Sequence, residues 1–210
     1  TSYIDYQSPF HPIISQGPMV VSQNHLSSEA GIEVIKKGGN AIDAAVAVGF
    51  SLAVTLPRAG NLGGGGFMLI YLKDQNEILA IDYRGESPSR LQTNQIFGVD
   101  LPGDYDKADR DIVRYGYKAS TVPGTVSGLL LAHTKFGKLP LKEVMKPAIQ
   151  QAKNGIDVSF DLEQAIASAP QLSWDDESRE IYLNDGRPLK EGSVMKRPDL
   201  ANTMNLISEN

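Results

Sequence analysis

The sequence of 210 residues predicts a layered α/β fold, and three observations support this class. An almost wholly apolar run from Ala44 to Leu56 predicts a helix that is covered on all sides. Two β-type runs, "FMLIYL" and "EILAIDYR", flank the polar turn "KDQN" and predict a hairpin. Helical periodicity then returns in "GTVSGLLLAHTKFG" and "PLKEVMKPAIQQAKNG". Helices followed by strands and again by helices indicate layers packed around one core.

The composition is that of a single folded domain, with 41% hydrophobic and 21% charged residues. The formal charge of −5 and the lack of a basic block argue against nucleic-acid binding. The absence of cysteine excludes disulfides, thiolate catalysis and cysteine-bound zinc. The longest apolar run, Ala44 to Leu56, is shorter than the ~20 residues that a membrane-spanning helix needs.

The first half of the chain predicts two helices before the hairpin. Ser27 or Ser28 can cap a helix through "EAGIEVIKK", which the glycines at 38 and 39 end. Asn40, with Asp43 three residues later, approaches a capping box at the start of the apolar helix, and Pro57 ends that helix. Both strands of the hairpin are apolar at most positions, which predicts a sheet covered on both faces.

The second half predicts a long polar loop over residues 85–117 and then mostly helices. Besides the two periodic segments above, residues 158–168 favour a helix, and a last helix begins near Pro198. An Asp-Gly turn in "EIYLNDGRPLKEG" lies between short β-like runs.

The glycine-rich phrase "AGNLGGGGFMLIYL" raises the question of a phosphate-binding loop. A P-loop needs Gly-Lys-Ser/Thr and a following helix, whereas Gly66 leads directly into a strand. A dinucleotide fingerprint follows a strand and opens a helix, which is the reverse order. Two interpretations remain open: a tight turn with close backbone packing, or the wall of a ligand site.

Metal-binding patterns are weak in this sequence. The three histidines, His11, His25 and His133, are far apart and show no paired ligand spacing. An acidic stretch lacks the central glycine and closing glutamate of an EF-hand, and we interpret it as a solvated loop. Its aspartates are Asp104, Asp106, Asp109 and Asp111.

No catalytic nucleophile stands out. The phrase "GTVSG" is not a Gly-x-Ser-x-Gly elbow, and its Ser127 lies in a helical pattern. Thr1 could in principle serve as an N-terminal nucleophile, but polar, extended residues follow it instead of a buried strand. We therefore interpret Thr1 as an ordinary chain end.

Arg84 is the most suggestive single residue. It ends the predicted strand "EILAIDYR", and its planar guanidinium suits a carboxylate ligand. The alternative is an internal salt bridge with Asp82, Glu86 or another neighbour, and spacing alone does not decide between the two.

Several long phrases together resemble one family. "GPMVVSQNHLSSEAGIEVIKKGGNAIDAAVAVGFSLAVTLPRAGNLGGGGFMLIYL", "AIDYRGESPSR" and "GYKASTVPGTVSGLLLAHTKFGKLPLKEVMKPAIQQAKNG" resemble the N-terminal part of the large subunit of the gamma-glutamyltranspeptidases, in the same order. The resemblance runs from about Phe10 to Asn210. Its "GGNAIDAAVAVGFSLAV" and "AGNLGGGGFM" blocks are long and specific.

The resemblance implies an N-terminal nucleophile hydrolase fold, a four-layer αββα sandwich, of which residues 1–210 would form a single segment. It implies cleavage of the γ-glutamyl amide of glutathione and related compounds, with transfer of the glutamyl group to water, amino acids or peptides. The nucleophile would be the first threonine of a small subunit cut from the same precursor, so no catalytic residue would lie in this chain. The glycine turn, residues 63–66, would pack against that subunit.

The resemblance assigns Arg84, in the phrase "D-Y-R", to binding the substrate's α-carboxylate. The family often continues with glutamate, any residue, alanine and proline, whereas here Gly85, Glu86, Ser87 and Pro88 follow, so Glu86 would have to replace that glutamate. No cofactor or metal is implied, and the implied location is periplasmic or extracellular. The alternatives are a related acylase or poly-γ-glutamate-handling enzyme, or a non-catalytic binding subunit with the same fold.

Overall fold

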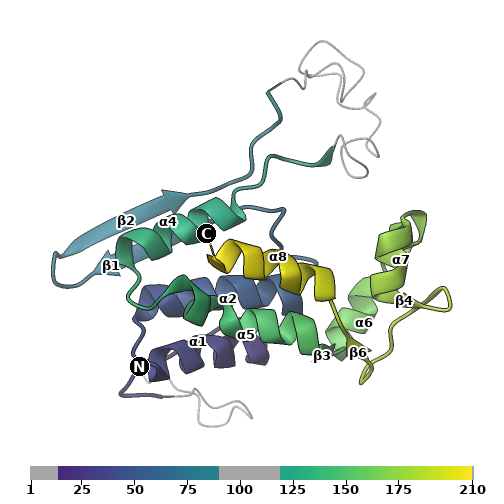
Figure 1. Ribbon diagram of the computed structural model, residues 1–210, viewed down its shortest axis with the longest axis horizontal. Helices are drawn as coiled ribbons and strands as arrows, with labels where there is room; N and C mark the ends of the chain where they lie inside the picture. Colours follow the sequence, from purple (N-terminus) through teal and green to yellow (C-terminus); the bar gives the residue numbers. More distant parts are fainter. Residues whose placement is uncertain (1–13, 90–118, 210) are drawn as a thin grey trace, which may run out of the picture.

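The computed structural model describes residues 14–89 and 119–209, which form helices and short strands (Figure 1). Its elements in chain order are α1 (His25–Lys36), α2 (Ala41–Thr55), β1 (Phe67–Leu72), β2 (Glu77–Asp82), α4 (Thr125–Phe136), α5 (Leu141–Asn154), β3 (Ile156–Asp157), α6 (Phe160–Ala167), the 3-10 helix η3 (Pro170–Trp174), α7 (Asp176–Tyr182), β4 (Leu183–Asn184), β5 (Arg187–Pro188), β6 (Val194–Met195) and α8 (Pro198–Glu209). This mixture confirms the predicted α/β class. Most of the predicted polar loop lies outside the described residues.

Helix α2 is the centre of the core. It packs against α1, α4 and α5, and α8 in turn packs against α5 (Figure 1). Val46, Phe50 and Val54 lie one turn apart and are almost completely buried. The burial of each such side chain contributes about 1.5–3 kcal/mol to folding. The prediction of a helix covered on all sides is thus confirmed for most of its positions but not for all, because Ala45 is exposed. No helix within residues 14–89 or 119–209 is long and apolar enough to cross a membrane.

The two first helices begin at asparagine caps. At α2, the Asn40 side chain accepts the N–H groups of Ile42 and Asp43, and Asp43 accepts the N–H of Asn40, which confirms the capping box. At α1, the predicted cap Ser27 or Ser28 is wrong. Asn24 accepts the Leu26 N–H at 2.9 Å instead, so the helix begins one turn earlier.

The predicted hairpin forms, with β1 and β2 antiparallel and Ile70 opposite Leu79. One face, including Ile70 and Ile81, packs into the core. The other face carries Phe67, Leu69, Tyr71 and Ile78, whose exposed fractions lie between 59% and 78%. The expectation of a sheet covered on both faces is thus wrong for the described part of the chain, because only one apolar face has a partner there.

The C-terminal part confirms the remaining predicted helices α5, α6 and α8. Gly155 ends α5 with a φ of 95°, a conformation that favours glycine. The Asp-Gly turn joins β4 to β5, with positive φ at both Asp185 and Gly186. Helix α7 and the pair β3–β6 were not predicted.

Candidate functional site

Arg84 lies two residues beyond the end of β2, at the edge of the hairpin. Its backbone N–H donates to Asp82 Oδ1 at 3.0 Å, which turns the chain away from the strand. The side chain of Arg84 is exposed. Within the described ranges, no carboxylate lies within 4.0 Å of its guanidinium, so the predicted alternative of a salt bridge with Asp82 or Glu86 is not realised there.

A cavity of about 260 Å³ lies beside Arg84. One wall comes from the chain after β2, with Tyr83, Arg84 and Glu86. The opposite wall is the segment that leads into α4 and its first turns, including Val122 and Ser127. The cavity thus joins the Arg84 guanidinium and the carboxylates of Asp82 and Glu86 with the Ser127 hydroxyl, from segments about forty positions apart. This arrangement suits a small polar ligand.

Two sets of backbone hydrogen bonds hold the segments around the cavity in place. Glu86 and Val122 form an antiparallel bridge, with N–O distances of 3.2 and 2.8 Å. The carbonyl oxygen of Gly64 accepts the N–H groups of Gly124 and Thr125, at 2.9 and 3.1 Å, at the start of α4. These are donors that a helix start leaves without intrahelical partners. The glycine turn therefore caps α4 and holds it against the Arg84 segment.

The glycine turn also answers the question raised by its sequence. A Cβ on Gly65 would lie 2.6 Å from the Tyr83 carbonyl oxygen, and one on Gly66 would lie 2.9 Å from the Tyr83 ring. Gly66 and Tyr83 exchange backbone hydrogen bonds of 3.2 and 3.0 Å. Close packing against this chain's own backbone therefore accounts for Gly65 and Gly66, and the turn leads into β1 without forming a helix.

The electrostatic character of the cavity depends on few groups. Tyr83 is half-buried, and this burial raises the pKa of its hydroxyl above the ordinary value of 10.0. The hydroxyl is therefore neutral near pH 7. The acidic and basic side chains among the described residues that line the cavity are Asp82, Arg84 and Glu86.

Of the other predicted candidates within the described residues, Ser127 lines the cavity, whereas His25 and His133 do not. Ser127 lies in the first turn of α4 and donates to the Gly124 carbonyl oxygen at 2.9 Å, which confirms the helical interpretation. His25 begins α1 and His133 lies in α4, and the described residues contain no cluster of three metal-ligating side chains. Thr1, His11 and the four aspartates from 104 to 111 lie outside the described residues.

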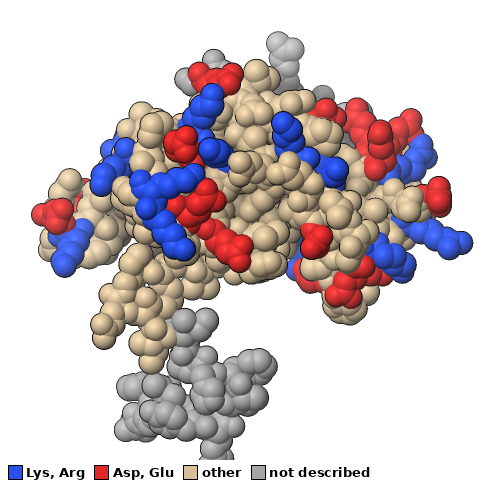
Figure 2. All heavy atoms as spheres, turned by 60° about the horizontal axis from the view of Figure 1, so that its bottom comes forward, with Lys and Arg blue, Asp and Glu red and all other residues tan. Residues whose placement is uncertain are grey.

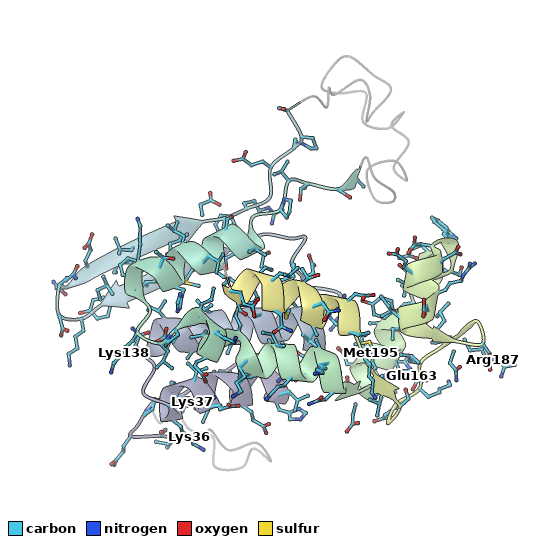
Figure 3. All side chains as sticks on the ribbon, viewed as in Figure 1. Lys36, Lys37, Lys138, Glu163, Arg187 and Met195 are labelled. Atoms are coloured by element: carbon cyan, nitrogen blue, oxygen red, sulfur yellow. The ribbon has the colours of Figure 1, made fainter. Side chains whose placement is uncertain are left out.

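The sequence did not single out a buried carboxylate at the other end of α4. Asp43 is completely buried and accepts the Lys138 N–H with both oxygens at 3.0 Å, and the His133 ring lies 3.7 Å away. Figure 3 shows Lys138 in the turn after α4, at the same end of the molecule as Lys36 and Lys37. The sequence did identify Asp43 as the capping-box aspartate. It did not reveal the contacts of this side chain with Lys138 and His133.

The surface offers no continuous basic face in the view of Figure 2. Lys and Arg are interspersed there with Asp and Glu. Directly after α1, for example, Lys37 pairs with Glu33 at 2.8 Å and with Glu143 of α5 at 3.5 Å. Such a mixed face is typical of ordinary solvated surface.

Comparisons with known proteins agree on one family. The family model described as gamma-glutamyltranspeptidase matches residues 27–210. The chain is 39% identical to the glutathione hydrolase proenzyme of Escherichia coli over its whole length, yet spans only 35% of that protein. The crystal structure of Helicobacter pylori gamma-glutamyltranspeptidase is similar at 35% identity and a TM-score of 0.86, covering 94% of this chain and 56% of that one. A cephalosporin acylase from Bacillus halodurans is similar at 25% identity and a TM-score of 0.75, covering 98% of this chain and 39% of that one.

Proposed function

Because this chain belongs to the gamma-glutamyltranspeptidase family, we propose that it is the large-subunit part of an enzyme that cleaves γ-glutamyl amides such as glutathione. The glutamyl group would pass to water, an amino acid or a peptide. The names of its relatives, glutathione hydrolase and gamma-glutamyltranspeptidase, support this reaction.

In the proposed reaction, this chain binds the donor and the rest of the precursor supplies the nucleophile. A threonine hydroxyl on the small subunit attacks the γ-carbonyl carbon, its own amine takes up the proton, and the amide C–N bond breaks as the leaving amine is protonated. Water or an acceptor amine then attacks the acyl-threonine ester and releases the glutamyl product. The chain spans about a third of its curated relative, and that relative is named a proenzyme, which supports the need for a second part.

The role of Arg84 is to anchor the α-carboxylate of the glutamyl group. The single observation that carries this role is an exposed guanidinium beside a cavity of about 260 Å³, which forms no ion pair with a carboxylate of the described residues. A planar guanidinium can bind both carboxylate oxygens at once, which gives direction as well as affinity.

The fold that we propose for the complete enzyme is the four-layer αββα sandwich. The exposed apolar face of the β1–β2 hairpin supports it, because Phe67, Leu69, Tyr71 and Ile78 form a surface that a second sheet would cover. The occupant would be the remainder of the same precursor. With this partner, the chain would be one segment of a larger domain. We also propose a periplasmic or extracellular location, because the family implies it.

The test of the Arg84 role compares variants of the complete processed enzyme. In Arg84→Ala, we expect the KM for a γ-glutamyl donor to rise about 30-fold or more, because a charged hydrogen-bonded pair is worth about 2–5 kcal/mol. Arg84→Lys keeps the charge without the planar fork, so its KM should lie between those of the wild type and Arg84→Ala. Arg187→Ala, on the distant β5 turn, is the matched control and should leave the KM unchanged (Figure 3). An unchanged KM in Arg84→Ala would refute the anchor.

The likeness to a cephalosporin acylase favours one second candidate, an acylase that acts on other side-chain amides. Steady-state rates on glutathione, a cephalosporin side-chain amide and poly-γ-glutamate separate the candidates by their kcat/KM ratios. A complete precursor without a threonine-led small subunit would instead identify a non-catalytic binding protein.

A further inference from the structure

Tyr83, the residue directly before Arg84, lies between two pairs of glycines. On one side are Gly65 and Gly66 of the glycine turn. A Cβ on Gly65 would lie 2.6 Å from the Tyr83 carbonyl oxygen, and one on Gly66 would lie 2.9 Å from Cε2 of the ring. This side of Tyr83 therefore has no space for another methyl group.

The second pair is on α4. Gly124 is the N-cap residue of α4 and Gly128 follows one turn later, so the two glycines share a face of the helix. A Cβ on Gly124 would overlap the Tyr83 carbonyl oxygen, and a Cβ on Gly128 would overlap Cβ and Cγ of the Tyr83 side chain. The backbone and the ring of Tyr83 thus rest directly on the helix. We call Gly65, Gly66, Gly124 and Gly128 the glycine cradle.

We propose that Tyr83 is a positioning residue, and that the glycine cradle around it sets the direction in which Arg84 enters the substrate cavity; this inference rests on the proposed function. Neighbouring Cα atoms are about 3.8 Å apart across one planar peptide, so a displacement of Tyr83 is passed on to Arg84. Misplacement of a substrate-binding group by about 1 Å can cost 100-fold in rate.

The contribution of Tyr83 is steric. Its hydroxyl is neutral at working pH because burial raises its pKa, so it adds no charge beside the guanidinium. Its ring is held by contact with glycine backbone on both sides. Protein interiors are close-packed and contain few voids, so an added methyl group displaces the neighbouring groups.

Gly128→Ala is the sharpest variant. Alanine favours a helix more than glycine does, so the change supports α4 while its methyl group pushes Tyr83 away. The matched control is Gly31→Ala in α1, where the added Cβ would also be crowded, at 2.9 Å from side-chain carbons of Val20 and Val48, in a helix that does not line the Arg84 cavity.

The experiment is a double-mutant cycle in the complete processed enzyme, with γ-glutamyl-p-nitroanilide as donor and kcat normalised to titrated active sites. We expect Gly128→Ala to raise the KM about tenfold or more with kcat within about threefold, and Gly31→Ala to leave the KM unchanged. In the Arg84→Ala background, Gly128→Ala should change the KM less than about twofold, because the group that it displaces is already gone.

A second pair of variants keeps the inference testable if Gly128→Ala gives no soluble enzyme. Tyr83→Ala removes the ring and should raise the KM, and Tyr83→Phe should recover most of that loss because it keeps the ring. Equal KM values in the two variants would overturn the inference.

The outcomes also separate this inference from the proposed function. If Arg84→Ala leaves the KM unchanged, the carboxylate anchor itself fails. If Arg84→Ala raises the KM but Gly128→Ala lowers only the amount of active enzyme, or the two effects simply add, the anchor stands and the positioning role is wrong.

Discussion

At the scale of single residues, Asp43 is a buried carboxylate that joins the start of α2 to the turn after α4. It is completely buried and accepts N–H groups from Asn40 and Lys138. We expect Asp43→Ala to lower the free energy of unfolding by at least about 2 kcal/mol, because these buried donors lose their acceptor. Urea denaturation of the complete protein measures the change.

The control for this prediction is Asp74→Ala in the exposed turn between β1 and β2. It removes the same group where no described side chain depends on it, and the free energy of unfolding should stay within about 0.5 kcal/mol. Equal effects of the two substitutions would show that the partners of Asp43 do not matter.

The same residues show how far local patterns predict a site. The Asn40–Asp43 capping box could be predicted, because both partners lie within one turn. The cap of α1 could not be chosen, because serines and an asparagine follow one another there. Ser27 is in fact buried, and its Oγ lies 2.8 Å from the hydroxyl oxygens of Ser51 and Thr55, which no local pattern reveals.

At the scale of elements, Glu163 joins α6 to the loop before β6. Its carboxylate accepts the Glu191 N–H at 2.8 Å and pairs with Lys190 at 2.9 Å. Figure 3 labels Glu163. The Glu191 N–H first, and Lys190 second, lower the pKa of Glu163 below its ordinary value of 4.5. A lowered pKa contributes stability that is present above the pKa of the unfolded chain and is lost as pH falls through the folded pKa.

We therefore expect Glu163→Gln to lower the unfolding midpoint in urea at pH 7. This difference from the wild type should shrink as the pH falls below the ordinary pKa of 4.5. Midpoints measured between pH 7 and pH 3.5 test the trend. Glu180→Gln, at an exposed position on α7, serves as the control. A difference that grows towards low pH would contradict the assignment.

Elements were predicted well where their signals are local. The four-residue turn between β1 and β2 and the Asp185–Gly186 turn both appear as expected, because turn chemistry depends on adjacent residues. Helix α7 was missed because it has no buried residue and thus no apolar stripe, and its start depends on the Asp175 cap. The Arg84 cavity was also beyond prediction, because its walls are distant in sequence.

At the scale of the whole molecule, the exposed hairpin face has the clearest consequence. Single monomers rarely leave a contiguous apolar patch such as Phe67, Leu69, Tyr71 and Ile78 uncovered. We expect Leu69→Asp in the complete precursor to reduce the yield of soluble, processed enzyme several-fold, since a charge would be buried against the remainder of the protein. Size-exclusion chromatography with quantification of both subunits measures this yield.

Lys73→Asp, in the turn that joins the same two strands, is the control and should leave the yield unchanged. A normal yield of processed enzyme from Leu69→Asp would show that nothing covers this face. The sequence correctly predicted strands apolar on both sides. It could not show that one of these sides lies uncovered among the described residues, because apolar strand positions give the same signal whether or not they are covered.

The bond between Asp43 and the backbone of Lys138 also sets an order of events during synthesis. The two residues are 95 positions apart, and Asp43 leaves the ribosome first. At about 5–20 residues per second, the carboxylate waits on the order of 5–20 s for its partners. During that interval, the start of α2 has its cap but its aspartate lacks its distant donors. The N-terminal helices are therefore expected to become protease-resistant only after the turn beyond α4 has been made.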